Sequence, residues 1–432
     1  MAKSNFFDAI GVADMEKVHS AVIGWMLSDN CTAFGEGENG RKIRSALLQK
    51  IFGISEPLEV DSIEYFVEWK NIDILIVTEK DNNKECWVIE NKIKSSQHSN
   101  QLNRYVDIMN CEYLLSSKAY KNDCFDGEDK EIIDEYLNGL RTKKIANPYY
   151  RCKKHFCFLT LIEEEANCSR TNVFWNNCKY EQLHQFLMTA LEQSREFGID
   201  PDREIIIEYR SCIETLKQAL NSFLEKHSAY KNVFTDGNKT KEEKIIEWSD
   251  PYFSPPEGSY AKYISDNGLE TIFQKCFLTT IAKKVFEGGT ECNGSHNYNI
   301  DDTRGNALLD YPFGKLGPYT IQFQFQNGSY KVQIIGDNSQ IQQFNNDWND
   351  VKSILKLLGA NWQFNKSKKD AKSYLSFSKP RDPQWYKYSL ETIKTNWTIA
   401  FEDCIKAKEI IIDIYNEKNS PSRKIPANTG IG

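Results

Sequence analysis

Two carboxylates and one lysine occupy matching positions on neighbouring apolar segments. Glu90 and Lys92 lie two residues apart in the segment 85–93 (ECWVIENKI), and Asp73 stands near the start of the segment 72–78 (IDILIVT). Side chains at positions i and i+2 of a strand point to the same face, so Glu90 and Lys92 are expected side by side. Counting outward from a turn centred near 81–82 makes Asp73 and Glu90 partners across a hairpin. The spacing predicts that all three meet at one end of a buried hairpin.

Such a cluster has a chemical use. Carboxylates on an apolar central strand lose hydration and repel each other, and a divalent cation relieves both costs. Magnesium prefers carboxylate and water oxygens, and phosphate oxygens can complete its shell. A metal held there can polarise a phosphodiester and generate hydroxide, while Lys92 orients the attacking water or neutralises developing charge. The alternative is a plain Glu90–Lys92 salt bridge at the solvent edge of a strand, because E-x-K triplets are common by chance.

Alternating strand and helix patterns surround these residues. The segments 72–78 and 85–93 are apolar on both faces, as in the centre of a sheet, and a polar turn at 79–84 joins them. Further strands are predicted at 63–69, 155–162 and 172–175. Apolar residues at helical spacing predict helices at 15–27, 41–52, 99–110, 181–196 and 203–226. The pattern predicts an α/β core with the hairpin at its centre.

Composition excludes several classes of protein. The formal net charge of −7 argues against a histone-like nucleic-acid binder, although local basic residues can still meet phosphate. The 12 cysteines show no zinc-ligand spacing, and neither a signal peptide nor an apolar run of roughly 18–20 residues is present, which together predict a cytoplasmic protein that does not enter membranes. Gly35, Gly37 and Gly40 fit G-x-G-x-x-G but follow a predicted helix, so we interpret them as a connection and not as a nucleotide-binding loop.

The length of 432 residues predicts more than one domain. We expect the α/β domain to span residues 1–235, with a charged insertion at about 114–147. A polar stretch at 236–243 is typical of a linker. An α+β domain of unknown role is then predicted at 240–420, with a hairpin turning at Asn327-Gly328, and residues 421–432 form a flexible tail.

At this point the segment IDILIV…CWVIENKIKSSQHSNQLNRY resembles the PD-(D/E)XK nuclease superfamily, in the form of bacterial members that carry IDI…IENK…QLxxY motifs. The resemblance covers roughly residues 14–195 and implies a restriction-endonuclease-like core, a mixed central sheet flanked by helices. It implies that Asp73 and Glu90 bind metal, that the carbonyl of Asn91 is a further metal ligand, and that Lys92 is catalytic. The cofactor implied is Mg²⁺, for which Mn²⁺ is expected to substitute.

Residues outside the hairpin extend this resemblance. Gln101, at helical spacing from Gln97 and Tyr105, matches a glutamine beside the family's active site, with a merely exposed glutamine as the alternative. Glu16 matches an acidic residue on the first helix that reaches the metal through water, with helix solvation as the alternative. Glu68 matches a supplementary acid, and His19 matches a family position but is more typical of a structural histidine.

Two functional hypotheses follow, and a third concerns regulation. The first is a metal-dependent endonuclease that hydrolyses DNA through a metal-activated water, which the resemblance associates with bacterial defence against foreign DNA. The second is a non-catalytic nucleic-acid-binding or assembly protein that retains the fold. The third is an effector nuclease gated by a C-terminal sensor domain. DNA is the expected partner, and a homodimer or a partner protein bound through the C-terminal domain is compatible with the sequence.

Overall fold

The computed structural model divides the chain into two compact units. The first comprises Met1–Asn221 with Ser265–Ile272, and the second comprises Ser222–Ile264 with Phe273–Gly432. The residues that the structure describes are 5–93, 101–114, 145–162, 164–195, 200–225, 233–234, 263–264, 266–287, 298–303, 306–326, 329–337, 339, 341, 348–369, 372–379, 385 and 388–419. Most of the predicted insertion at 114–147, the linker at 236–243 and the tail at 421–432 therefore lie outside the described residues.

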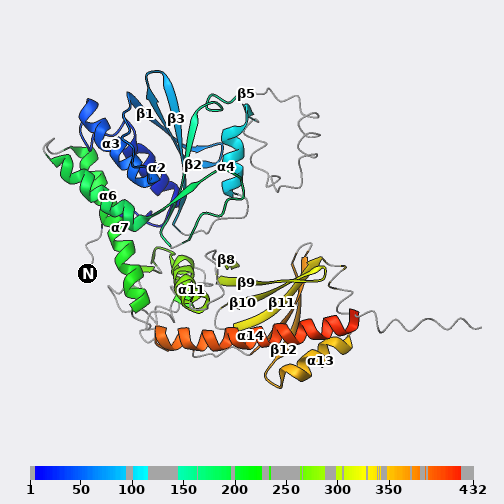
Figure 1. Ribbon diagram of the computed structural model, residues 1–432. Coiled ribbons are helices and arrows are strands. Elements are labelled where there is room, and N and C mark those ends of the chain that lie inside the picture. The colour runs from blue at the N-terminus through cyan, green and yellow to red at the C-terminus, as the bar shows by residue number, and fades with distance from the viewer. Residues whose placement is uncertain are drawn as a thin grey trace, which may run out of the picture. The chain divides into compact units, whose positions relative to one another are not determined.

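The first unit is built on a mixed five-stranded sheet with helices on both faces (Figure 1). The strand order is β1-β2-β3-β6-β7, in which β1, β2 and β3 pair antiparallel and β3, β6 and β7 pair parallel. Its strands are β1 (Ser62–Trp69), β2 (Ile72–Lys80), β3 (Asn83–Lys92), β6 (Lys153–Thr160) and β7 (Trp175–Lys179), with a small separate pair β4 (Tyr113–Leu114) and β5 (Ile145–Ala146). Its helices are α1 (Phe6–Ala9), α2 (Glu16–Leu27), α3 (Gly37–Phe52), α4 (Gln101–Asn110), α6 (Tyr180–Gln193) and α7 (Pro201–Glu225). This confirms the predicted mixed central sheet flanked by helices.

Tight turns set the register of the first three strands. Lys70 and Asn71 connect β1 to β2, and Asp81 and Asn82 connect β2 to β3; all four have positive φ, between 49° and 64°. Two-residue turns of this kind match the twist of a hairpin, and asparagine and aspartate tolerate that conformation. The predicted turn at 79–84 is thus shorter in the structure, because both strands continue to its central pair.

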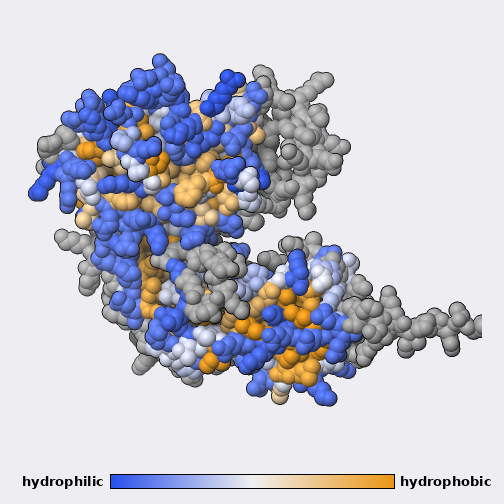
Figure 2. Space-filling model, in the orientation of Figure 1, coloured by the Kyte–Doolittle hydropathy of each residue, from blue (hydrophilic) through white to orange (hydrophobic). Residues whose placement is uncertain are grey.

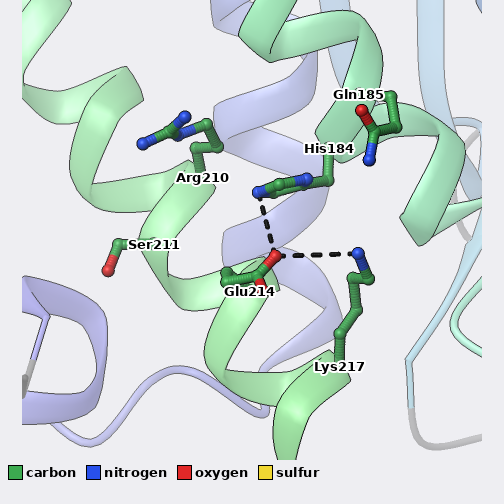
Figure 3. A pocket seen from close by; sticks show the side chains of 6 residues that line it. All are labelled: His184, Gln185, Arg210, Ser211, Glu214 and Lys217. Atoms are coloured by element: carbon green, nitrogen blue, oxygen red, sulfur yellow. Dashed lines mark ion pairs between the residues drawn. The ribbon is translucent and has the colours of Figure 1, made fainter. Parts of the chain in front are cut away.

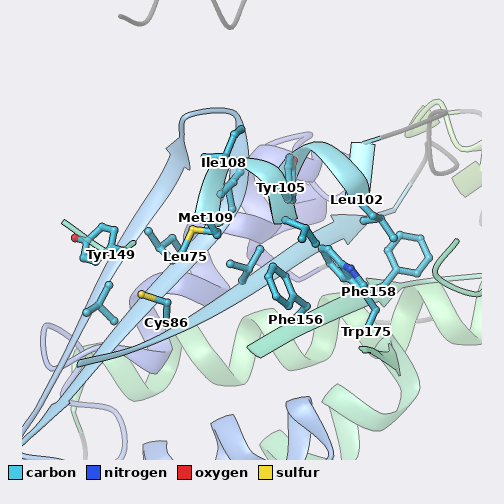
Figure 4. Packing of buried hydrophobic residues seen from close by; sticks show 14 residues of the cluster. Leu75, Cys86, Leu102, Tyr105, Ile108, Met109, Tyr149, Phe156, Phe158 and Trp175 are labelled. Atoms are coloured by element: carbon cyan, nitrogen blue, oxygen red, sulfur yellow. The ribbon is translucent and has the colours of Figure 1, made fainter. Parts of the chain in front are cut away.

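The two faces of this sheet are packed differently. Leu75 pairs with Val88, and their face contacts helix α4 through an apolar cluster that includes Leu102 and Tyr105 (Figure 4). Ile74 pairs with Ile89 on the opposite face, where Ile74 lies close to Gly24 of α2. Helices cover both faces, and accordingly the central residues 74–77 of β2 and 86–89 of β3 are apolar, as the sequence indicated. A polar side chain at the end of β2 or β3 is therefore shielded from water.

The loop between α2 and α3 is fixed by a buried arginine. Arg44 is 2% exposed, and its guanidinium donates to the carbonyl oxygens of Cys31 and Gly35 at 2.9 and 3.3 Å and to Asp29 Oδ1 at 2.9 Å. The backbone of Gly40 lies against this loop, since a Cβ atom there would sit 1.8 Å from the carbonyl oxygen of Gly35. Gly35 lies in this connection, whereas Gly37 and Gly40 belong to the start of α3, so the predicted connection is shorter in the structure; only Gly40 is required for close backbone packing.

Replacing Gly40 with alanine is expected to destabilise the protein by at least about 2 kcal/mol, because a methyl group cannot fit against a backbone carbonyl without moving the loop. Chemical denaturation measures this loss. Lys42→Ala, on the exposed side of the same helix, is the control and should change the free energy of unfolding by only a few tenths of a kcal/mol. Equal stability of the two variants would contradict the packing argument.

The second unit is an α+β unit with a six-stranded antiparallel sheet, in the order β12-β13-β11-β10-β9-β8. Its strands are β8 (Asn299–Thr303), β9 (Asn306–Leu316), β10 (Tyr319–Gln326), β11 (Ser329–Asp337), β12 (Gln363–Lys369) and β13 (Lys372–Ser378). Its helices include α11 (Glu270–Glu287), α13 (Trp348–Leu358) and α14 (Leu390–Asn419). Aromatic rings join the long helix α14 to the sheet, as between Trp397 and Phe325. Apolar surface is visible over this unit (Figure 2), and its exposed apolar side chains include Leu357 and Ile399.

The hairpin predicted in this unit is present as β10 and β11, with Gln326 paired to Ser329, although the turn residues 327–328 lie outside the described residues. Strands β8, β9 and β12 did not appear in the sequence prediction. Strand β12 (QFNKSKK) is a polar edge strand without apolar alternation, and β9 (NALLDYPFGKL) contains proline and glycine, which ordinarily argue against a strand.

Within the described ranges, no helix has the length and apolar character needed to cross a membrane. The described cysteines are all free thiols.

Candidate active site

The structure brings Asp73, Glu90 and Lys92 together on the α4-facing side of the sheet. Ile74 pairs with Ile89, and continuing this register by one residue sets Asp73 opposite Glu90. Lys92 Nζ lies 2.6 Å from Glu90 Oε1. The alternative of a salt bridge at a solvent edge does not hold, because Glu90 is 0% and Lys92 5% exposed. The ion pair is instead a buried one, next to a second carboxylate.

Burial dominates the electrostatics of this cluster, and at Asp73 the charge of Glu90 adds to it. Desolvation, followed by the charge of Glu90, raises the pKa of Asp73 well above its usual value. Desolvation also raises the pKa of Glu90, although the Lys92 ammonium opposes this. For Lys92, desolvation lowers the pKa, but the charges of Glu90, Asp73 and Glu16 outweigh it and the pKa rises. The lysine is therefore held as a cation within a cluster that has an excess of carboxylates.

Beyond the last pair of β2 with β3, which is Ile74 with Ile89, the edge of β3 lines this cluster with backbone groups. The Asn91 N–H donates to Asp73 Oδ2 at 2.9 Å, and the Ile93 N–H donates to Glu16 Oε1 at 2.9 Å. The Lys92 carbonyl points toward β6 instead and accepts a backbone hydrogen bond of 3.0 Å from that side. Since the N–H and C=O of one strand residue point to the same neighbour, the Asn91 carbonyl faces the edge flanked by Asp73 and Glu16.

Helix α4 adds two polar side chains over the same face. Gln101 Nε2 donates to the Tyr105 hydroxyl at 3.1 Å, and both residues are buried. Gln101 Oε1 is buried without a hydrogen-bond partner among the described residues. Desolvation and then the charge of Glu90 raise the pKa of Tyr105 well above its usual value, which places its hydroxyl beside the carboxylates. Gln101 is thus buried next to the cluster and is not the merely exposed residue of the alternative interpretation; Gln97 lies outside the described residues.

Two other sequence candidates lie apart from the cluster. The side chain of Glu68 is half exposed and pairs with Lys17 at 2.9 Å, so it does not join Asp73 and Glu90. His19 is buried, with its ring nitrogens 3.0 Å from the Tyr209 hydroxyl and 2.8 Å from the Ala13 carbonyl oxygen. Desolvation lowers the pKa of His19 to about 4, so the ring is neutral and structural at physiological pH. Sequence reasoning missed the contacts of the Asn91 side chain, which depend on residues distant in the chain.

The donor set fits a hard divalent cation. The predicted donors Glu16, Asp73 and Glu90 carry carboxylate oxygens, and Asn91 carries a carbonyl oxygen, so this candidate set contains no sulfur or imidazole. Magnesium and manganese take such oxygens together with water. Among the described residues, no group of three or more histidine, cysteine, aspartate and glutamate side chains is arranged to hold a metal by itself. Backbone and water oxygens would therefore have to complete the coordination.

A separate polar pocket of about 410 Å³ lies between α6 and α7 (Figure 3). His184 Nε2 and Lys217 Nζ lie 3.1 and 3.6 Å from Glu214 Oε2, and Lys217 Nζ is 3.5 Å from Glu181 Oε1. These contacts join α6 to α7. Because the lining includes none of the residues around Asp73, the pocket is distinct from the carboxylate cluster, and we interpret its ion pairs as a link between the two helices.

The chain matches a known family over part of its length. The family described as the PD-(D/E)XK nuclease superfamily matches residues 4–211, which include every residue of the cluster described above. This confirms the resemblance inferred from the motifs and implies a restriction-endonuclease-like fold for the first unit. No curated protein and no solved structure matches the chain in the corresponding comparisons.

Proposed function

Because residues 4–211 match the PD-(D/E)XK nuclease superfamily, we propose that the protein is a metal-dependent endonuclease that hydrolyses DNA phosphodiester bonds. The observation that carries the proposal is the placement of Asp73, Glu90 and Lys92 on one buried face, with the Asn91 carbonyl at the adjoining edge. A purely structural sheet end would gain nothing from buried carboxylates that repel each other. A role in defence against foreign DNA rests on the resemblance to bacterial members and belongs to the proposal.

Asp73, Glu90 and the Asn91 carbonyl would hold a magnesium or manganese ion, with Glu16 beside them. When bound, such an ion supplies Lewis-acid polarisation of the phosphate and lowers the pKa of a coordinated water. Backbone N–H groups of the chain orient two of these carboxylates. The Ile93 N–H fixes one oxygen of Glu16, and the Asn91 N–H fixes one oxygen of Asp73, so both carboxylates are oriented before any ligand arrives.

Lys92 acts as a fixed cation in this scheme. The charges of Glu90, Asp73 and Glu16 raise its pKa and so favour the protonated form of the side chain. An ammonium held against Glu90 can donate a hydrogen bond to the attacking water and stabilise negative charge that develops on the phosphate. Gln101, whose Oε1 is buried without a partner among the described residues, would accept a hydrogen bond from the same water or from the substrate.

The test is cleavage of plasmid and single-stranded DNA while magnesium or manganese is titrated. We expect cutting that requires the metal, stops in EDTA and returns when metal is restored. Linearisation or nicking of a covalently closed plasmid shows endonuclease action, and RNA of the same sequence tests the choice of DNA. Binding of DNA without cleavage at any metal concentration would favour the non-catalytic nucleic-acid-binding alternative.

A further inference from the structure

The Asn91 side chain points to the opposite face of the sheet from Glu90 and Lys92 and is fully buried there. Its Nδ2 donates to Ser20 Oγ at 3.0 Å and to the Glu16 carbonyl oxygen at 3.2 Å. Its Oδ1 accepts a hydrogen bond of 2.7 Å from the Tyr180 hydroxyl. The asparagine amide is thus held by α2 from one side and by α6 from the other.

The partners of Asn91 are themselves fixed. Tyr180 and Tyr209 are both 0% exposed, and the His19 ring packs edge-on against Tyr180 with centroids 5.6 Å apart. The Ala13 carbonyl can only accept a hydrogen bond, so His19 Nε2 carries the proton and Nδ1 accepts from the Tyr209 hydroxyl. These residues come from β3, α2, α6 and α7, so four elements converge behind the Asn91 peptide.

The backbone of Asn91 faces the carboxylates. The Asn91 N–H binds Asp73, and the Asn91 carbonyl faces the edge between Asp73 and Glu16. The Glu16 carbonyl also accepts a hydrogen bond from the Asn91 side chain, so Glu16 contacts this segment both there and at the Ile93 N–H. The N–H and the carbonyl of Asn91 lie on either side of its Cα, so a small shift of the Asn91 backbone would move the carbonyl and loosen the bond to Asp73 at the same time.

We propose that Asn91 and Tyr180 are positioning residues that hold the Asn91 carbonyl in place for the metal. This rests on the proposed function, because it assigns a task to side chains behind the proposed metal site. Packing alone does not require these groups to be polar, since phenylalanine and leucine would fill the same space without needing hydrogen-bond partners. A fully satisfied polar network instead specifies one orientation of the peptide.

The test is Tyr180→Phe, which removes the hydroxyl and leaves the ring. Manganese binding is measured by calorimetry, and the magnesium concentration for half-maximal cleavage is measured alongside. We expect both to weaken about 10- to 100-fold, the range for removing a partner that orients a metal ligand. Tyr149→Phe is the matched control, because this tyrosine is also buried but its hydroxyl has no hydrogen-bond partner among the described residues.

Ser20→Ala removes a different bond to the same amide and should shift metal binding in the same direction. Unchanged manganese binding in both Tyr180→Phe and Ser20→Ala, with an active parent, would overturn the inference while leaving the proposed function intact. Failure of the parent protein to bind manganese or to cleave would instead refute the proposed function. A loss of thermal stability without a change in metal affinity would also count against positioning.

Discussion

Lys92→Met is expected to lower the rate of DNA cleavage by roughly 10²- to 10³-fold, the loss typical when a group that stabilises transition-state charge is removed. The variant keeps the aliphatic part of the side chain and removes only the cation. Manganese binding should not be lost and should become tighter, because the ammonium 2.6 Å from Glu90 competes with the metal for that carboxylate. Single-turnover cleavage and calorimetry separate the two effects.

The matched control is Lys17→Met, which removes an exposed ammonium from its pair with Glu68. An exposed pair contributes little, so cleavage, metal affinity and stability should all stay close to those of the parent. If Lys92→Met cleaves within tenfold of the parent, the lysine is only a structural counter-charge for Glu90. If manganese binding disappears with cleavage, Lys92 supports the site and does not act in the chemical step.

The hairpin that carries the cluster could be predicted because its determinants are local. Two apolar strands flank Asp81 and Asn82, residues that tolerate positive φ, and a two-residue turn leaves one register available. Counting outward from that turn is enough to set Asp73 against Glu90. The alternation of side chains along a strand then brings Lys92 to the same face. Burial of the pair also follows, since β3 is apolar on both faces.

The contacts behind the cluster could not be predicted in this way, because they join residues far apart in the chain. Tyr180 lies 89 residues from Asn91, and nothing in either local pattern indicates that their side chains meet. The family motif names Asn91 only for its backbone carbonyl and gives no role to its amide. The edge strands of the second unit were missed for a related reason. Strand β12 is defined by pairing with β13, while its own residues are polar.

Asp73→Asn is expected to abolish cleavage and, in EDTA at neutral pH, to stabilise the protein by on the order of 1–2 kcal/mol. Asparagine keeps an oxygen to accept the Asn91 N–H but carries no charge to be desolvated or repelled by Glu90. The pKa of Asp73 in the folded state lies well above 3.8, its value in the unfolded chain. As pH rises, Asp73 therefore loses its proton more readily in the unfolded chain, and the free energy of unfolding of the parent falls. The advantage of asparagine should therefore be absent near pH 4 and grow toward neutral pH. Denaturant unfolding of the parent and of Asp73→Asn, measured from pH 4 to neutral pH, shows directly whether asparagine raises the free energy of unfolding.

Asp61→Asn is a control for which removal of the charge is expected to have the opposite effect on stability. Asp61 is exposed, and its pKa is lowered by the hydrogen bond from the Asp81 N–H, so its charge favours the folded state and its removal should give no stabilisation.

Magnesium provides the second comparison. It should raise the unfolding midpoint of the parent, because an ion that binds only the folded state adds to its stability, and it should leave Asp73→Asn almost unchanged. A parent that equals or exceeds the stability of Asp73→Asn in EDTA at neutral pH would show that the carboxylate is not strained without a metal, and the electrostatic argument for a metal site would fail.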